Sequence, residues 1–263
     1  MNNIDPIGIF DSGVGGTSIW KEINQLLPLE NTIYLADSIN APYGNKTSEE
    51  IISLSKKNTE LLIQKGCKII VVACNTATTN AISLLRSTYD IPIIGIEPAI
   101  KPAALNSSTK CVGILATKGT LSSDLFHKTS QAFAKDIKII EVIGEGLVPL
   151  IEDGAIHSDD MRSLLKIYTA EMIREDIDYL VLGCSHYPYI IPELQKILPS
   201  NVKIIDSGLA VAKQTKNVLE TLNLLNSSEE KPTLDFYVNA NKKTLTEILR
   251  IYQDNIIITK IAF

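Results

Sequence analysis

The chain alternates short apolar runs with longer stretches in which apolar residues recur at helical spacing. The short runs are rich in Ile, Val and Leu, which is typical of strands buried on both faces of a parallel sheet. We predict strands at Ile7–Phe10, Thr32–Ala36, Ile69–Ala73, Ile93–Ile96, Cys111–Ala116, Ile137–Val142, Tyr179–Gly183 and Val202–Ile205. We predict helices at Thr47–Lys65, Thr76–Tyr89, Thr120–Ala134 and Ser158–Asp176. Alternating strands and helices predict an α/β fold.

An internal repeat relates two parts of the chain. IGIFDSG at 7–13 resembles VGILATKG at 112–119, and KIIVVACNT at 68–76 resembles DYLVLGCSH at 178–186. The repeat predicts two similar lobes, each a mostly parallel sheet flanked by helices.

The predicted lobes divide the chain at two places. The first lobe is expected to contain 1–97 and 207–263, and the second 98–206. The tail after Ser207 carries no third copy of the pattern, so we expect it to pack back on the first lobe. Ligands of parallel sheets bind beyond the carboxyl ends of the strands, which predicts an active site in the cleft between the lobes.

Composition and charge narrow the function classes. The 263 residues carry a net charge of −5, with 45% hydrophobic and 21% charged residues. This is a globular composition without a basic stripe, so we expect neither disorder nor nucleic-acid binding. No apolar run is long enough for a membrane span, and the N-terminus does not resemble a signal peptide. The four cysteines are therefore expected to be reduced thiols in a cytoplasmic protein.

Two cysteines occupy equivalent places in the repeat. Cys74 ends a predicted strand before NTATT, and Cys184 ends another before Ser and His186. A helix N-terminus favours a thiolate, and an imidazole can polarise or deprotonate a thiol. Either cysteine alone would more simply be a small buried hydrophobe. Their equivalent positions favour a catalytic pair, whereas Cys67 and Cys111 precede no polar cluster and are expected to be structural.

Polar loops follow the other strands. DSGVGGT at 11–17 either cradles an anion or is a tight turn, and it matches neither the dinucleotide-binding nor the P-loop spacing. DSINAPYG at 37–44 either binds a small polar ligand or is a turn with a packed Tyr. TKGT at 117–120 is its counterpart in the second lobe. Glu152 is either a second carboxylate at the site or a surface acid at a helix end.

The remaining residues suggest no cofactor. His127 and His157 lie in polar surroundings and are expected to face solvent, and no histidine has zinc-ligand spacing. No C-x-x-C motif occurs, which disfavours thioredoxin chemistry. We therefore expect activity without a metal or an organic cofactor.

Taken together, the motifs resemble the cofactor-independent aspartate/glutamate racemase family over about residues 7–210, in the expected order. The motifs that carry the resemblance are Asp11-Ser12-Gly13, Pro42-Tyr43-Gly44, Cys74-Asn75-Thr76-Ala77-Thr78, Ala116-Thr117-Lys118-Gly119-Thr120 and Gly183-Cys184-Ser185-His186-Tyr187-Pro188. The resemblance implies two α/β lobes around an amino acid, with two cysteines as acid and base.

The resemblance also implies roles for individual residues. It makes Cys74 and Cys184 catalytic, assisted by Asp11 and His186 respectively. Cys74 would deprotonate D-glutamate and Cys184 L-glutamate. The implied substrate-binding residues are Asp11, Ser12, Tyr43, Gly44, Asn75, Thr76, Ser185 and His186, with Glu152, Thr117 and Thr120 as possible supporting residues. One departure is Ser185, where the family usually has Thr; the hydroxyl is kept and a methyl is lost.

The implied function is interconversion of L- and D-glutamate, supplying D-glutamate for peptidoglycan synthesis. Two thiols approaching Cα from opposite lobes supply the geometry that inversion requires. The alternatives are an aspartate or other amino-acid racemase, and an amino-acid-binding regulatory module. Glutamate is the expected small-molecule partner, and the expected assembly is a homodimer. Because the chain lacks a long N-terminal extension, we expect no dependence on an activating peptidoglycan precursor.

Overall fold

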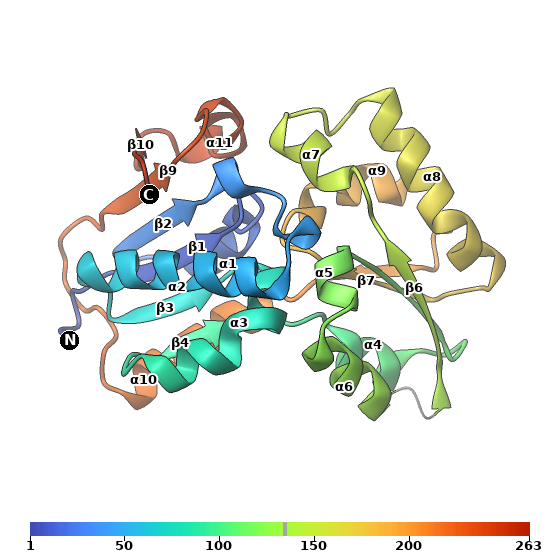
Figure 1. Ribbon diagram of the computed structural model, residues 1–263, viewed down its shortest axis with the longest axis horizontal. Helices are drawn as coiled ribbons and strands as arrows, with labels where there is room; N and C mark the ends of the chain where they lie inside the picture. Colours follow the sequence, from blue (N-terminus) through green and yellow to red (C-terminus); the bar gives the residue numbers. More distant parts are fainter. Residues whose placement is uncertain (134–135) are drawn as a thin grey trace.

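The computed structural model describes residues 1–133 and 136–263 and shows two α/β lobes side by side (Figure 1). The sheet of the first lobe has the order β10-β9-β2-β1-β3-β4 with all neighbouring strands parallel. Its strands are β1 Ile7–Asp11, β2 Thr32–Ala36, β3 Ile69–Val72, β4 Ile93–Gly95, β9 Leu234–Val238 and β10 Ile257–Lys260.

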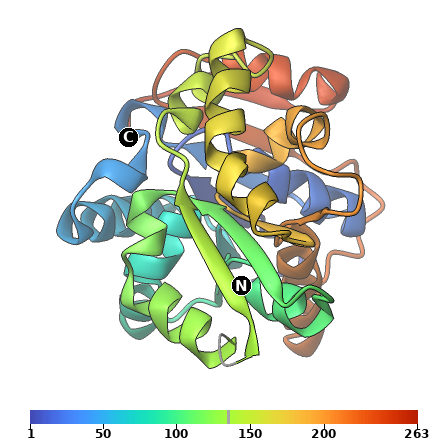
Figure 2. The ribbon, with the colours of Figure 1, turned by 90° about the vertical axis from the view of Figure 1, so that its right-hand side faces the viewer.

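The second lobe repeats the arrangement of the first. Its parallel sheet has the order β6-β5-β7-β8 and stands in front in Figure 2. Its strands are β5 Cys111–Ala116, β6 Lys138–Ile143, β7 Tyr179–Gly183 and β8 Lys203–Ile205. The order β2-β1-β3-β4 in the first sheet matches β6-β5-β7-β8 in the second, which confirms the two-lobe α/β fold and the repeat.

Helices cover both faces of each sheet. Those of the first lobe are α1 Thr17–Leu26, α2 Ser48–Gln64, α3 Asn75–Thr88, α10 Gly208–Thr221 and α11 Lys243–Ile248. Those of the second lobe are α4 Ile100–Asn106, α5 Lys118–Leu121, α6 Asp124–Phe133, α7 Leu147–Glu152, α8 Asp159–Arg174 and α9 Ile191–Gln195. Short 3₁₀ helices occupy Ser38–Asn40, Tyr43–Asn45, Tyr187–Ile190 and Arg250–Tyr252. No helix in the described part of the chain is long and apolar enough to cross a membrane.

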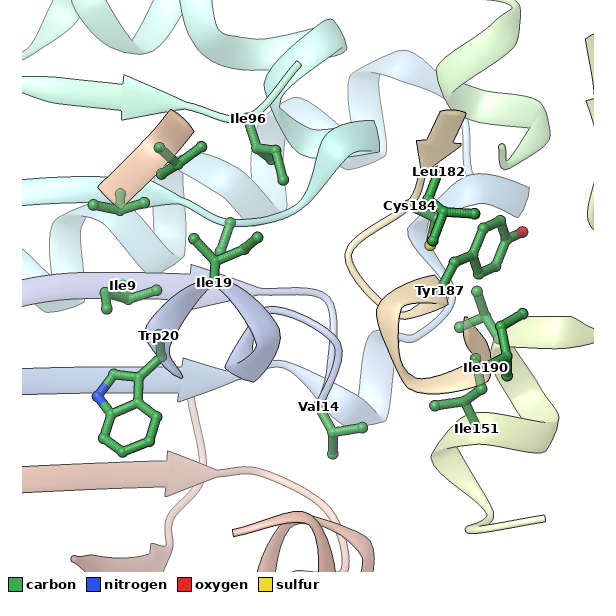
Figure 3. Packing of buried hydrophobic residues seen from close by; sticks show 14 of the residues in the cluster. Ile9, Val14, Ile19, Trp20, Ile96, Ile151, Leu182, Cys184, Tyr187 and Ile190 are labelled. Carbon is green, nitrogen blue, oxygen red and sulfur yellow. The ribbon is translucent and has the colours of Figure 1, made fainter. Parts of the chain in front are cut away.

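The core follows from the alternation of side chains along each strand. In β1, Ile7 and Ile9 pack with α1 and α10, whereas Phe10 packs with α2 and α3 on the opposite face. The first of these clusters continues into the second lobe, where Val14 faces Ile151 and Ile190 across the gap (Figure 3). Apolar packing therefore holds the two lobes against each other beside the cleft.

Most predicted elements are confirmed to within one residue at either end. The single helix predicted over Thr120–Ala134 is wrong, because α5 ends at Leu121 and a new helix begins at Asp124. The Oγ of Ser123 accepts a hydrogen bond from the N–H of Phe126 at 3.3 Å, which caps the second helix. Ala134, the last residue of the predicted helix, lies outside the described residues.

The C-terminal strands were not predicted. Both β9 and β10 join the first sheet beyond β2, so the tail after Ser207 contributes to that lobe. The division of the chain at 97/98 and 206/207 remains our proposal for the lobe boundaries.

A buried ion pair stabilises the first sheet at the amino-terminal ends of its strands. The Nζ of Lys68, which is fully buried, lies 2.5 Å from Oε2 of Glu30 and donates to the carbonyls of Asn3 and Leu224. The other oxygen of Glu30 accepts from the N–H of Asn226 at 2.8 Å. The pair thus ties the chain start and the C-terminal segment to β3.

Removing one partner of this pair should be strongly destabilising. Lys68→Ala leaves the Glu30 carboxylate buried without its cation, and we expect the free energy of unfolding to fall by about 3–5 kcal/mol. Urea unfolding followed by the fluorescence of Trp20 measures this. Lys138→Ala, which breaks the exposed pair with Glu175, is the control and should change stability far less. Equal losses in the two variants would contradict this account.

Candidate active site

A small cavity lies where the carboxyl ends of the two sheets face each other. Its volume is about 10 Å³, which is roughly the room that one water molecule needs, so the two lobes are nearly closed over it. Both lobes line it: the residues are Ser12, Pro42, Tyr43, Gly44, Cys74, Asn75, Thr76, Thr117, Val148, Cys184, Ser185 and His186. Seven of the eight predicted substrate-binding residues thus line one cavity together with both cysteines, and Asp11 lies buried behind it.

Cys74 follows β3 and caps α3. Its Sγ accepts a hydrogen bond from the N–H of Ala77 at 3.4 Å, and the residue is 4% exposed. Burial, and next the carboxylate of Asp11, raise the pKa of the Cys74 thiol well above its ordinary value, and the Ala77 N–H opposes this shift.

The raised pKa of Cys74 differs from what the sequence predicted. The helix N-terminus was expected to favour the Cys74 thiolate, and its N–H does contact the sulfur. Burial outweighs that contact and raises the pKa. In the free protein Cys74 is therefore a thiol, ready to donate a proton.

Cys184 follows β7 at the equivalent position and lies beside Tyr187 (Figure 3). Its partner differs from that of Cys74, because its Sγ is 3.8 Å from Nδ1 of His186. The other ring nitrogen of His186 is 2.6 Å from Oε1 of Glu152. Cys184, His186 and Glu152 thus form a relay on the second lobe.

Two members of this relay, His186 and Glu152, are charged. Burial lowers the pKa of His186, but the contacts with Cys184 and Glu152 and the charge of Asp11 outweigh it and raise that pKa well above its usual value. Burial acts to raise the pKa of Glu152, but the contact with His186 holds it below its usual value. His186 is therefore an imidazolium that lies between the Glu152 carboxylate and the Cys184 sulfur.

The glycine-rich loop after β1 lets this relay approach the first lobe. A Cβ at Gly13 would overlap the Glu152 carboxyl, and a Cβ at Gly15 would overlap the His186 ring. Between them, the N–H of Val14 donates to Oε1 of Glu152 at 2.7 Å. The loop therefore receives a carboxylate of the other lobe, which combines the tight-turn and anion-binding interpretations.

Asp11 joins the two lobes beneath the cavity. Its Oδ2 accepts from the N–H of Gly13 at 3.1 Å, and its Oδ1 accepts from the Oγ of Ser185 at 2.9 Å. Burial raises the pKa of Asp11 above its usual value, although His186 opposes the shift. The Ser185 hydroxyl, the one departure from the family pattern, makes a contact that needs no methyl group.

Asn75 stands out because its side chain is unpaired. Both its Oδ1 and its Nδ2 are buried without a hydrogen-bond partner among the described residues, and the residue is 3% exposed. An unsatisfied buried amide is costly, so a ligand in the cavity is the natural partner.

Thr76, Thr117 and Thr120 form a hydroxyl cluster across the lobes. The Oγ1 of Thr76 is 2.8 Å from that of Thr117 and 3.2 Å from that of Thr120. Thr76 and Thr117 line the cavity, whereas Thr120 is fully buried behind them. The cluster fixes the side of the cavity formed by α3 and α5.

Tyr43 is a packed side chain. It is 1% exposed, and its hydroxyl donates to Oδ2 of Asp37 at 2.5 Å. The turn interpretation thus holds for the ring, and the loop presents Gly44 to the cavity opposite Thr117.

Sequence reasoning gave no role to Val148, and it marked Asp37 and Ser38 only as the start of the 37–44 loop. Val148 lines the cavity from α7, and no sequence motif marks it. The Oγ of Ser38 donates to Oε2 of Glu152 at 3.1 Å. A further signal existed for Asp37 and Ser38, because an Asp-Ser pair also stands at the carboxyl end of β1.

The cysteines and histidines that were expected to have no catalytic role lie outside the cavity. Cys67 and Cys111 are buried free thiols that do not line the cavity. His127 is exposed, and His157 is 73% exposed with its Nδ1 2.8 Å from Glu193. Across 1–133 and 136–263, no group of three or more His, Cys, Asp or Glu side chains could hold a metal ion.

Comparisons with known proteins agree on one family. Residues 7–215 match the family described as Asp/Glu/Hydantoin racemase. The glutamate racemase of Stutzerimonas stutzeri is 43% identical over 94% of this chain and 93% of its own. The crystal structure of glutamate racemase isoform RacE1 from Bacillus anthracis has a TM-score of 0.88 at 28% identity, covering 100% and 99% of the two chains. Escherichia coli glutamate racemase, solved with L-glutamate and the activator UDP-MurNAc-Ala, has a TM-score of 0.85 at 32% identity over 98% of both chains.

The raised pKa of Cys74 can be tested by alkylation. A thiol reacts as its thiolate, and raising the pH increases the thiolate fraction until the pKa is passed. We expect the rate at which iodoacetamide labels Cys74, followed peptide by peptide with mass spectrometry, to go on increasing beyond pH 9. A rate that levels off below pH 9 would show that burial does not control this thiol.

Proposed function

The chain belongs to the Asp/Glu/Hydantoin racemase family, and we propose that it inverts glutamate with one cysteine thiol from each lobe. The observation that carries the proposal is that Cys74 and Cys184, at equivalent strand ends, line the same cavity. It is an isomerase, a glutamate racemase, and it supplies D-glutamate for the peptidoglycan of the cell wall, as is typical of this enzyme.

In the proposed mechanism the two thiols exchange the roles of base and acid when the direction of the reaction reverses. With L-glutamate, the Cys184 thiolate takes the Cα proton and becomes a thiol, leaving the electron pair on Cα and the carboxylate. The Cys74 thiol then gives its proton to the opposite face and becomes a thiolate. D-Glutamate reacts in reverse. The cysteines act as a coupled pair that holds one proton in total before substrate binds.

The surrounding residues have roles that fit this chemistry. Asp11 is fully buried and its charge acts on Cys74, and this acid suits the substrate ammonium. A bound ammonium also brings positive charge toward Cys74, which favours its thiolate. Asn75, Thr76 and Ser185 offer hydrogen bonds to the substrate carboxylate, where charge develops during proton abstraction. Ser12, Tyr43 and Gly44 close the cavity from the first lobe.

Other parts of the proposal are independent of the mechanism. We propose a cytoplasmic location, which the four free thiols support. A homodimer also stays a prediction, as does activity without a metal or an organic cofactor.

Substrate choice tests the function directly. Incubation of L-glutamate with the protein should give an equal mixture of enantiomers, whereas L-aspartate should be converted poorly or not at all. Chiral chromatography measures both reactions, before and after dialysis against a chelator, which should change neither. Faster conversion of aspartate would favour the aspartate alternative. Conversion of neither amino acid would favour the regulatory module.

Removal of either active-site thiol should stop inversion. Cys74→Ala and Cys184→Ala each lose one acid–base group, so racemisation should fall by ~10²–10⁴-fold or more. Cys74→Ala should retain at most slow exchange of the Cα hydrogen of L-glutamate with solvent, and Cys184→Ala the same for D-glutamate. Proton NMR in D₂O follows the exchange.

The other two cysteines provide matched controls. Cys67→Ala and Cys111→Ala remove buried thiols that do not line the cavity, and their rates should stay within a small factor of the parent. A Cys74→Ala or Cys184→Ala protein that racemises both enantiomers at near-normal rate would rule out the two-thiol mechanism.

A further inference from the structure

The segment from Asn239 to Thr244, which follows β9, contacts the active site from behind on both lobes. Neither residue lines the cavity. Asn239 is 6% exposed and binds the 37–44 loop of the first lobe. Thr244 lies in the first turn of α11 and binds the end of α7 in the second lobe. We call 239–244 the C-terminal strap.

Asn239 fixes the loop that carries Tyr43 and Gly44. Its Nδ2 donates to Oδ1 of Asp37 at 2.6 Å, and its Oδ1 accepts from the N–H of Ile39 at 2.9 Å. The second oxygen of Asp37 accepts from the hydroxyl of Tyr43 at 2.5 Å. A chain of two side-chain hydrogen bonds thus runs from the strap to the loop that closes the cavity, within a buried region where such bonds define position most strongly.

Thr244 fixes the residue that carries the relay. Its Oγ1 donates to the backbone carbonyl of Glu152 at 2.6 Å. Glu152 is the last residue of α7, so its carbonyl has no partner within the helix and needs one outside it. The side chain of Glu152 then holds His186, which faces Cys184.

We propose that Asn239 and Thr244 are positioning residues, which hold the substrate loop through Asp37 and the His186–Cys184 pair through Glu152. This proposal rests on the proposed function for its kinetic consequences. Because a misplacement of about 1 Å can cost about 10²-fold in rate, small shifts of either contact should be visible in kinetics.

Asn239→Ala tests the first contact, and Asn226→Ala is its control. Asn226 is also a buried asparagine of the C-terminal part with side-chain hydrogen bonds, but it binds Leu29 and Ser228 away from the cavity. Both variants should lower the melting temperature. Asn239→Ala alone should raise KM for glutamate, by about tenfold, the equivalent of one lost hydrogen bond.

Exchanging the side chains of residues 37 and 239 gives a stricter test. Asn239→Asp places a second carboxylate beside Asp37 and should raise KM at least as much as Asn239→Ala. Adding Asp37→Asn restores one donor and one acceptor between the positions, and KM should partly recover. If Asn239→Ala and Asn226→Ala share the parent KM, the strap does not position the loop.

Thr244→Val tests the second contact without requiring turnover, and Thr246→Val is its control. Thr246 has the same side chain in the same helix, and its hydroxyl bonds to the Lys242 carbonyl instead. Without the contact to Thr244, Glu152 holds His186 less firmly against the Cys184 sulfur, so Thr244→Val should slow alkylation of Cys184 several-fold relative to Cys74. Thr246→Val should change neither rate.

The outcomes separate the two proposals. In Thr244→Val, kcat should fall several-fold with little change in KM, and kcat/KM must fall equally in both directions because a racemisation has an equilibrium constant of one. Equal alkylation of Cys184 in both threonine variants would overturn the role of Thr244. A wild-type protein without glutamate turnover would overturn the proposed function, while the alkylation result would still decide the contact.

Discussion

The structure depends on one constraint, that the carboxyl edges of two parallel sheets face each other across a narrow gap. Strands β3 and β7 occupy the same place in the two sheet orders, so the residues that follow them approach the gap from opposite sides. Cys74 and Cys184 are those residues, and both line the cavity, one from each lobe. The matching strand orders therefore bring one thiol from each lobe to a single cavity, as the proposed inversion of a stereocentre requires.

The two halves are alike in backbone and unlike in electrostatics. Cys74 has Asp11 as its charged neighbour, and burial keeps it protonated. Cys184 has an imidazolium that Glu152 holds in place. In a pair with identical surroundings, a single shared proton would bind either sulfur equally well. The unequal neighbours distinguish the two thiols, as the proposed roles of base on the second lobe and acid on the first require.

The sequence predicted the repeat, the four strands of each lobe that carry it and the cavity-lining motifs, because each depends on local periodicity or on polar residues at strand ends. It did not predict β9 and β10, because their pairing with β2 is a long-range contact that no repeat marks. The split between α5 and α6 depends on a serine cap within an otherwise helical pattern. The pKa of Cys74 could not be predicted either, because burial is a property of the folded protein.

Contacts made at a distance along the chain explain the remaining differences. Glu152 contacts His186 because Gly13 and Gly15 leave space for both side chains. The glycine-rich loop and His186 each lie in a motif, but no motif shows that they meet at Glu152. Asn75 was chosen by resemblance, whereas the structure gives a physical reason in its two unpaired amide atoms.

The most direct test of two bases is the fate of the Cα hydrogen in the wild-type protein. L-Glutamate is incubated in D₂O, and both enantiomers are separated and analysed by mass spectrometry before equilibrium is approached. The two-thiol account predicts that D-glutamate carries deuterium at Cα while the remaining L-glutamate keeps protium, because the second proton comes from a thiol that has exchanged with solvent. Deuterium entering L-glutamate as fast as D-glutamate forms, or D-glutamate that retains its protium, would contradict it.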